Sequence, residues 1–290
     1  MSILVDEDTK VIVQGITGRE GKFHAGLMQD YGTDVVAGVT PGRGGKKIKG
    51  IPVFDTVSKA KKETGANTSI LFVPPRFTQE AIIEAVSAGL DLVVAVAEGV
   101  PFQDMLYCYN YARYHDCVLI GPNTPGVISP GQSKVGFMSG DIYQEGRVGI
   151  MSRSATLSYE TSNNLSNRGI GQSTVVGIGG DPIQGATFVD LLPLYEKDEQ
   201  TELVVLLGEI GGEDEERAAE YIKNNMSKEA VALIAGEAAP EGKRMGHAGA
   251  IVSPGGEGGA GYKKRVLAEA GIEIADELTE IPEIAENMLE

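Results

Sequence analysis

The chain has 290 residues, of which 42% are hydrophobic and 23% charged, and this balance excludes an intrinsically disordered protein. With 25 basic against 41 acidic residues the net charge is −16, which excludes non-specific binding to nucleic acid or to an anionic membrane as the main activity. We see no signal peptide and no run of about 18 apolar residues, so we expect a cytoplasmic protein without a membrane span.

Short apolar runs alternate with helical patterns through the first 120 residues. We predict strands over residues 11–13, 35–39, 51–54, 69–73, 92–96 and 117–120. We predict helices over about residues 22–30, 57–64, 78–88 and 102–115. Continuous apolar strands that alternate with helices are typical of a doubly wound parallel sheet covered on both faces.

Glycine- and proline-rich loop signals then interrupt this rhythm over residues 121–146, which we predict to be a linker region. A second series follows, with strands over residues 148–151, 173–178, 203–207, 230–234 and 272–274. Its helices are expected over about residues 155–168, 186–197, 213–225 and 280–289. The sequence thus predicts two α/β domains, 1–125 and 126–290, and the glycine cluster 255–261 predicts a mobile loop in the second.

A glycine-rich turn follows the first predicted strand. Gly15, Gly18 and Gly21 have a spacing of three and three, a variant of the dinucleotide-binding fingerprint that can bring phosphate to a helix N-terminus. The second strand lacks the acidic residue that would bind the ribose of NAD, and Arg43 and Lys46 follow it instead. Such cations suit a phosphorylated ribose, as in NADP or CoA. Purely structural glycines and a solvated basic loop are the alternatives.

The second domain holds a candidate nucleophile. His247 lies between Gly246 and Gly249, in a segment where its ring would be accessible, although a lone loop histidine is more often structural. Glu209 ends a predicted parallel strand and could hold one ring nitrogen so that the other attacks. Ser154 begins a helix and is either a plain N-cap or part of an anion site.

The spacing of Cys108 and Cys117 fits no metal motif, so we predict two buried free thiols and no metal site.

Seven segments, in order, closely resemble the α subunit of succinyl-CoA synthetase (succinate–CoA ligase). They are Gln-Gly-Ile-Thr-Gly (14–18), Gly-Val-Thr-Pro-Gly-Arg-Gly-Gly (38–45), Gly-Pro-Asn-Thr-Pro-Gly-Val-Ile-Ser-Pro-Gly (121–131), Ser-Arg-Ser-Ala-Thr-Leu-Ser-Tyr-Glu (152–160), Gly-Ile-Gly-Gly-Asp-Pro-Ile (177–183), Gly-Glu-Ile-Gly-Gly (208–212) and Gly-Lys-Arg-Met-Gly-His-Ala-Gly-Ala (242–250).

This resemblance implies a Rossmann-like CoA-binding domain followed by a flavodoxin-like domain that carries a phosphohistidine. The implied reaction converts succinyl-CoA, phosphate and a nucleoside diphosphate (ADP or GDP) to succinate, CoA and the triphosphate, reversibly. A separate β subunit would hold Mg-nucleotide and most of the carboxylate site, in an αβ or α2β2 assembly.

The resemblance also implies roles for individual residues. Those matching the family's CoA-binding positions are Thr17, Gly18, Arg19, Glu20, Arg43, Val96, Ala97 and Glu98. Tyr159 matches a substrate-site residue, Glu209 the carboxylate partner and His247 the phosphohistidine. The helix that starts at Ser154 and Ala155 would stabilise the phosphoryl group.

Two positions depart from the family pattern. Thr124 stands where many members have Cys, and we interpret this change as neutral for catalysis. Arg43 replaces a Lys, which keeps the charge but changes the geometry towards CoA. A related α-type subunit acting on malate or citrate is an alternative. A nucleotide-dependent oxidoreductase and a non-catalytic CoA- or nucleotide-sensing subunit are the readings from other functional classes.

Overall fold

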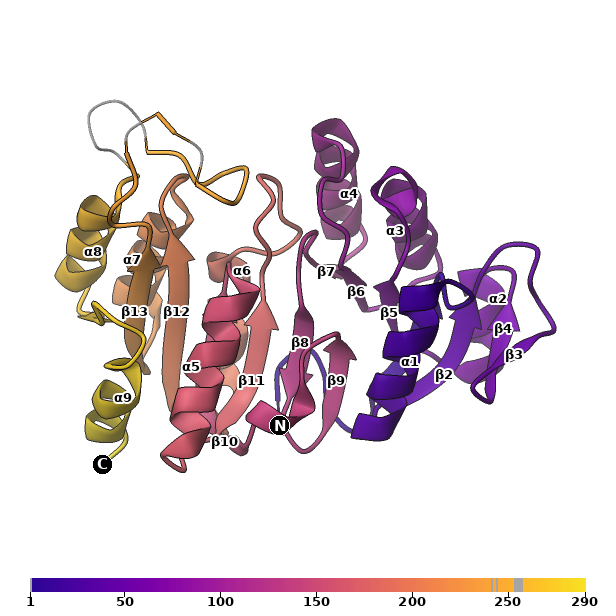
Figure 1. Ribbon diagram of the computed structural model, residues 1–290, viewed down its shortest axis with the longest axis horizontal. Helices are drawn as coiled ribbons and strands as arrows, with labels where there is room; N and C mark the ends of the chain where they lie inside the picture. The colour runs from indigo at the N-terminus through magenta and orange to yellow at the C-terminus, as the bar shows by residue number, and fades with distance from the viewer. Residues whose placement is uncertain (1, 241, 244, 253–257) are drawn as a thin grey trace.

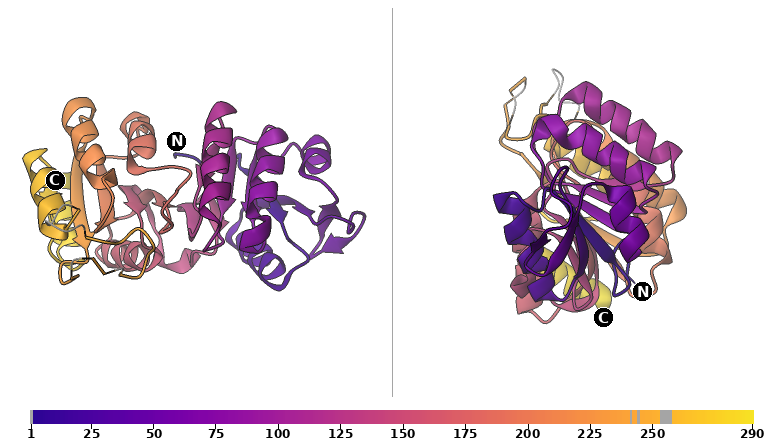
Figure 2. Two further views of the ribbon diagram at one scale, coloured as in Figure 1. Left: turned by 90° about the horizontal axis from the view of Figure 1, so that it is seen from above. Right: turned by 90° about the vertical axis from the view of Figure 1, so that its right-hand side faces the viewer.

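The computed structural model describes residues 2–240, 242–243, 245–252 and 258–290, and within these ranges the chain forms two seven-stranded sheets. The sheets lie side by side along the long axis of the molecule, with helices on both faces (Figure 1). Seen from above, α2, α3, α4, α6 and α7 line one side, while α1 and α5 lie on the other (Figure 2). Within the same ranges, none of the helices is long and apolar enough to cross a membrane.

The first sheet has the order β3-β4-β2-β1-β5-β6-β7 and is parallel except for the β3–β4 pair. Its strands are β1 (Lys10–Gln14), β2 (Asp34–Val39), β3 (Lys47–Ile48), β4 (Ile51–Phe54), β5 (Thr68–Leu71), β6 (Leu92–Ala95) and β7 (Val118–Ile120). Without the short edge strand β3, this is the 3-2-1-4-5-6 order of the Rossmann fold. The predicted fold class of the first half is therefore confirmed.

Helices α1 (Arg19–Tyr31), α2 (Val57–Thr64), α3 (Thr78–Ser87) and α4 (Phe102–Tyr114) connect these strands, and a short 3-10 turn (Pro75–Phe77) precedes α3. Helix α3 packs between α2 and α4, whereas α1 contacts β9 of the second sheet. The central strands are buried because helices cover both faces, which explains their uninterrupted apolar sequences.

The second sheet has the order β14-β13-β12-β10-β11-β8-β9. Its strands are β8 (Gly126–Ser129), β9 (Ser133–Gly136), β10 (Glu145–Ser152), β11 (Gln172–Gly177), β12 (Leu203–Glu209), β13 (Glu229–Ala235) and β14 (Glu273–Ile274). The parallel part, β11-β10-β12-β13-β14, has the 2-1-3-4-5 order of flavodoxin-like folds. Its helices are α5 (Ala155–Asn167), α6 (Phe188–Lys197), α7 (Asp214–Asn225), α8 (Ala260–Glu269) and α9 (Ile281–Leu289), and a 3-10 turn spans Gly140–Ile142.

The segment 121–146 is more structured than the predicted linker. It contains the antiparallel strands β8 and β9, which extend the second sheet beyond β11. The two strands approach so closely that a Cβ atom on Gly126 would lie 2.2 Å from the carbonyl oxygen of Val135. Gly126, which reads as a loop signal, is therefore required by strand pairing.

A second difference concerns the glycine cluster 255–261, predicted to be a mobile loop. Residues 255–257 lie outside the described residues, but α8 begins at Ala260, inside the predicted loop. We did not predict this helix, because its first turn carries two small residues, Ala260 and Gly261, directly after a run of glycines. Helix α8 packs against α7 and β13.

Candidate active site

His247 and Glu209 form the centre of the site. Glu209 is the last residue of β12, and its Oε2 accepts a hydrogen bond from Nδ1 of His247 at 2.6 Å. The side chain of His247 is 28% exposed and that of Glu209 is 11% exposed, so the pair lies just below the surface. The hydrogen bond to Glu209 raises the pKa of His247 above its ordinary value, while burial and the nearby Arg153 oppose this rise. The predicted pairing of Glu209 with a ring nitrogen of His247 is thus present at Nδ1, and the second ring nitrogen, Nε2, is not part of this pair.

Arg153 forms an ion pair with the other oxygen of the Glu209 carboxylate. Its Nε lies 3.2 Å from Oε1 of Glu209, and its Nη1 donates to Oδ2 of Asp214 at 3.1 Å. The Arg153 side chain is buried, and its backbone N–H donates to the carbonyl of Leu207 in β12. Because β10 and β12 are neighbours, the residue that follows β10 reaches the residue that ends β12. Sequence reasoning missed Arg153, although it precedes the helix start that we singled out.

Glycines shape the space around the imidazole. A Cβ atom on Gly180 would lie 2.3 Å from Cδ2 and 2.4 Å from Nε2 of His247, so the ring packs directly over the backbone there. Gly211 has φ of +87°, and a Cβ atom there would lie 2.1 Å from the carbonyl oxygen of Gly249. Both positions require glycine, since any side chain would push the segment around His247 away.

The N-terminus of α5 adjoins this cluster, because Arg153 directly precedes its N-cap. The Ser154 hydroxyl accepts from the backbone N–H of Leu157 at 3.4 Å, so Ser154 does act as a cap. The Ser154 backbone N–H donates to the hydroxyl of Ser152 at 3.1 Å. Ala155 is the first helical residue, at the end of α5 where the helix dipole favours an anion.

One predicted CoA-binding stretch reaches the same place from the other sheet. Glu98 and Gly99 follow β6 and line a cavity of about 260 Å³ together with Asp181 and Ala248, the residue after His247. Asp181 accepts hydrogen bonds from the Gly99 N–H at 3.1 Å and from Nδ2 of Asn123 at 3.2 Å. The buried Asp181 therefore ties the carboxyl end of β6 to the carboxyl end of β11.

Val96 and Ala97 lead from β6 into this cavity, and the carbonyl of Ala97 accepts from the backbone N–H of Asn123 at 2.9 Å. Sequence reasoning assigned no role to Asp181 or Gly180. The sequence signal that could have identified them is an acidic residue, Asp181, directly after two glycines beyond the end of a strand. Ligand sites form at such positions in α/β sheets.

The glycine turn lies at the carboxyl end of β1. Gly15 has φ of +76°, and a Cβ atom there would lie 2.3 Å from the carbonyl oxygen of Phe72. Gly18 is the N-cap of α1, and the Thr17 hydroxyl donates to that of Thr40 at 3.2 Å. Next to the turn, a cavity of about 360 Å³ is lined by residues at the ends of β1 and β2 and by α3.

The predicted basic and acidic residues of this region point to solvent. Arg19 and Glu20 begin α1, with side chains that are 95% and 62% exposed. Arg43 is an exposed residue of the loop after β2, and its backbone N–H donates to the carbonyl of Thr40.

Tyr159 packs against a hydrophobic core cluster. It sits in the second turn of α5 and packs against the core cluster that contains Tyr143, with Tyr31 at the same cluster. Its hydroxyl is buried without a hydrogen-bond partner among the described residues. Burial raises the pKa of Tyr159 to about 12. The structure therefore brings Glu209 and Glu98 to the His247 segment, and Ser154 follows Arg153 of the same cluster in the sequence, while Tyr159 packs against a hydrophobic core cluster.

The two cysteines, Cys108 and Cys117, are buried free thiols, as predicted, and burial raises the pKa of each to about 12.

Comparisons with known proteins give one result over the whole chain. Residues 6–99 match the family model described as CoA binding domain, and residues 151–272 match that described as CoA-ligase. The α subunit of ADP-forming succinate–CoA ligase from Aquifex aeolicus is 53% identical over 100% of this chain and 95% of the relative. Subunit alpha 1 of the same ligase from Archaeoglobus fulgidus is 54% identical over 100% of this chain and 99% of the relative.

Solved structures share the fold. ATP citrate lyase from Methanosaeta concilii, a D541A mutant in complex with (3S)-citryl-CoA, superposes with a TM-score of 0.90 at 26% identity. The match covers 99% of this chain and 50% of that one, so this chain spans about half its length. A dinucleotide-forming acetyl-CoA synthetase from Ca. Korarchaeum cryptofilum gives a TM-score of 0.71 at 17% identity over 93% of this chain and 58% of that one, which shows the fold alone.

Proposed function

Because the chain belongs to the family of succinate–CoA ligase α subunits, an acid–thiol ligase family, we propose that His247 is the residue that carries the phosphoryl group in its reaction. The observation that carries the proposal is the 2.6 Å hydrogen bond between Nδ1 of His247 and Oε2 of Glu209. With Nδ1 occupied, Nε2 is the nucleophile. The neighbouring N-terminus of α5 offers the phosphoryl group a site with positive potential.

Phosphoryl transfer to His247 needs only an acyl phosphate and the residues described above. In the direction of thioester cleavage, Nε2 of neutral His247 attacks the phosphorus of an acyl phosphate. A P–N bond forms, the P–O bond to the acyl group breaks, and the carboxylate leaves with the electron pair of that bond. The Nδ1 proton stays on the ring, where Glu209 stabilises the positive charge that the imidazole gains. Arg153 keeps Glu209 in place during this change.

CoA is the second ligand, in keeping with the CoA-binding family model. We propose that the turn of Thr17, Gly18, Arg19 and Glu20, with Arg43, binds its phosphates. The N-terminus of α1 in this turn and the exposed guanidinium groups support the assignment. Val96, Ala97 and Glu98 would then guide the thiol end towards the cavity beside Ala248, which adjoins His247. We propose Tyr159 as a substrate-side residue on the basis of the family resemblance; its side chain packs against the core cluster that contains Tyr143.

The domain assignment follows the two sheets. We propose that residues 1–125 form the CoA-binding domain and that residues 126–290 form the ligase domain. The family models match within these limits, and β8 begins at Gly126.

The remaining components would lie on a partner. We propose a β subunit that binds Mg-nucleotide and completes the carboxylate site, in an αβ or α2β2 assembly located in the cytoplasm. The designation of the relatives as ADP-forming α subunits supports a β partner and ADP as the nucleotide. Their identity of 53% and 54%, against 26% for the citrate lyase, favours succinate over citrate as the acid.

Phosphorylation of the assembled enzyme tests the proposal. The chain is co-expressed with its β partner, purified, and incubated with ATP or GTP labelled on the γ-phosphate. We expect acid-labile, base-stable label on the α chain that succinate and CoA together discharge, and no label in the His247→Ala variant. Equal labelling of His247→Ala and the parent would refute the assignment.

A further inference from the structure

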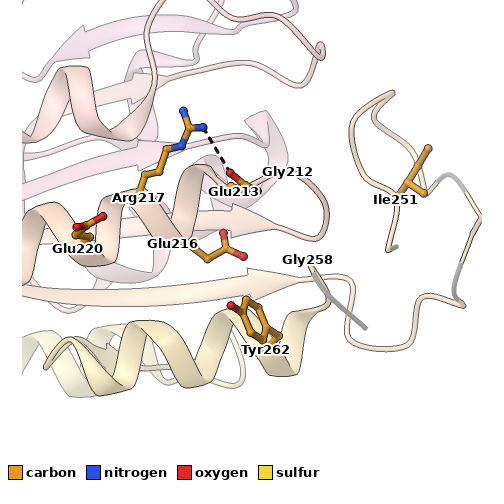
Figure 3. A pocket seen from close by; sticks show the side chains of 8 residues that line it. All are labelled: Gly212, Glu213, Glu216, Arg217, Glu220, Ile251, Gly258 and Tyr262. Atoms are coloured by element: carbon orange, nitrogen blue, oxygen red, sulfur yellow. Dashed lines mark hydrogen bonds and ion pairs between the residues drawn. The ribbon is translucent and has the colours of Figure 1, made fainter. Parts of the chain in front are cut away.

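A buried ion pair lies directly behind the end of β12. Lys263 of α8 and Glu215 of α7 have side chains that are 0% exposed, and Nζ of Lys263 donates to Oε2 of Glu215. Nζ also donates to Oε2 of Glu216 at 3.1 Å. Figure 3 shows Glu216 on α7 facing Tyr262, the neighbour of Lys263, on α8. The two helices are thus joined by the fully buried Lys263–Glu215 pair, with the partly exposed Glu216 at its edge.

The second oxygen of Glu215 reaches the backbone of the site. Its Oε1 accepts a hydrogen bond from the N–H of Glu209 at 3.1 Å. The carboxylate fits there because residue 208 is glycine: a Cβ atom on Gly208 would lie 2.6 Å from Cγ and 2.7 Å from Oε1 of Glu215. One carboxylate therefore connects Lys263 to the residue that orients His247.

Stability alone gives a weak reason for this arrangement. Taking two charges out of water is costly, and apolar residues of similar volume are often as stable in such a place or more so. What an apolar pair lacks is an acceptor for the Glu209 N–H, at the point where the strand ends and the position of the Glu209 carboxylate is set.

We propose that Glu215, held by Lys263, is a positioning residue for phosphoryl transfer: it fixes the backbone of Glu209 and thereby the orientation of His247. The inference rests on the proposed role of His247. Glu215 and Lys263 do not touch the reacting atoms, and both act through Glu209. A displacement of about 1 Å at such a site can lower a rate by about a hundredfold.

Two double variants separate the hydrogen bond from the charges. The Met/Gln variant, Lys263→Met with Glu215→Gln, removes both charges but keeps a carbonyl oxygen for the Glu209 N–H. The Met/Met variant, Lys263→Met with Glu215→Met, removes both charges and the acceptor. Lys264→Met is the matched control, because Lys264 is the next residue of α8 and pairs with the exposed Glu237 and Asp276.

Each variant is assayed in the complete complex with the β subunit for the rate of His247 phosphorylation across pH. We expect the Met/Met variant to lose about tenfold to a hundredfold in rate. We expect the Met/Gln variant to keep most of the parent rate, and Lys264→Met to match the parent. The rise of the rate with pH should move to lower pH in the Met/Met variant, because a misplaced Glu209 raises the pKa of His247 less.

A parent-like rate and pH profile for the Met/Met variant would overturn the proposal, and so would equal losses in both double variants. If the Met/Met variant does not fold, Lys263→Met with Glu215→Leu, which also removes both charges and the acceptor, is measured in its place: a lower rate with a shifted pH profile supports the role, and parent-like behaviour refutes it. Failure of the parent to label His247 would instead refute the proposed function, so the two outcomes are distinguishable.

Discussion

Replacing Glu209 by Gln removes the negative charge beside His247 while keeping the size of the side chain. In the parent, Glu209 accepts from Nδ1 of His247 at 2.6 Å, and Arg153 lies 3.2 Å from its other oxygen. A hydrogen bond to a charged group contributes about 1.5–3 kcal/mol. Since the His247 side chain is about a quarter exposed, at 28%, we take the lower half of this range, about 1.5–2 kcal/mol.

In the proposed reaction this energy applies to the phosphorylated His247 ring, whose positive charge Glu209 would stabilise. A loss of about 1.5–2 kcal/mol in the transition state lowers the phosphorylation rate by about tenfold to thirtyfold. The pH profile should change as well. Glu209 raises the pKa of His247, so neutral imidazole forms only at higher pH in the parent, and the rate of Glu209→Gln should rise at lower pH.

The same linkage affects stability. The bond to Glu209 favours the protonated ring, so its contribution is complete below the ordinary histidine pKa of about 6.5 and is lost as pH rises through the raised value. The difference in melting temperature between parent and Glu209→Gln should therefore shrink with rising pH. Rapid-quench labelling of the αβ enzyme across pH provides the rates. An unchanged rate and pH profile in Glu209→Gln would refute the idea that Glu209 orients and stabilises His247.

Three further substitutions test the surroundings of the pair. Gly180→Ala should lower phosphorylation by about a hundredfold with little change in folding, because the new Cβ occupies the place of the imidazole; an intact labelling rate would contradict the stacked position of His247. Asp181→Ala leaves the Gly99 N–H without its acceptor and should weaken CoA binding measured by calorimetry by about tenfold; unaltered affinity would count against a role of this cavity. Thr124→Cys should lower the free energy of unfolding by about 1 kcal/mol in denaturant titrations, since the buried Thr124 hydroxyl donates to one backbone group and accepts from another. Activity should be unchanged, and a loss of activity would contradict the interpretation of Thr124 as neutral for catalysis.

The sequence predicts the parallel strands of both sheets and most of their helices, because buried strands between helices have uninterrupted apolar runs. Glu209 could be predicted for a related reason: a carboxylate at the end of such a strand is visible in the sequence itself. Strands β8 and β9 could not, since their pairing depends on glycines that look like loop signals. Helix α8 could not be predicted either, because the partners of its buried face, Glu215 and helix α7, are distant in the sequence.

The residues that sequence reasoning missed are those whose roles depend on strand order. β10 lies between β12 and β11, so the residue after β10 can reach Glu209 at the end of its neighbour β12. Arg153 occupies that central position, and its Nη2 would lie 3.8 Å from a Cβ atom on Gly249 in the histidine segment. The order β12-β10-β11 is a property of the crossover connections, which no local pattern records. A different strand order with the same sequence motifs would separate Arg153 from Glu209, so His247 is oriented by the topology as much as by its own segment.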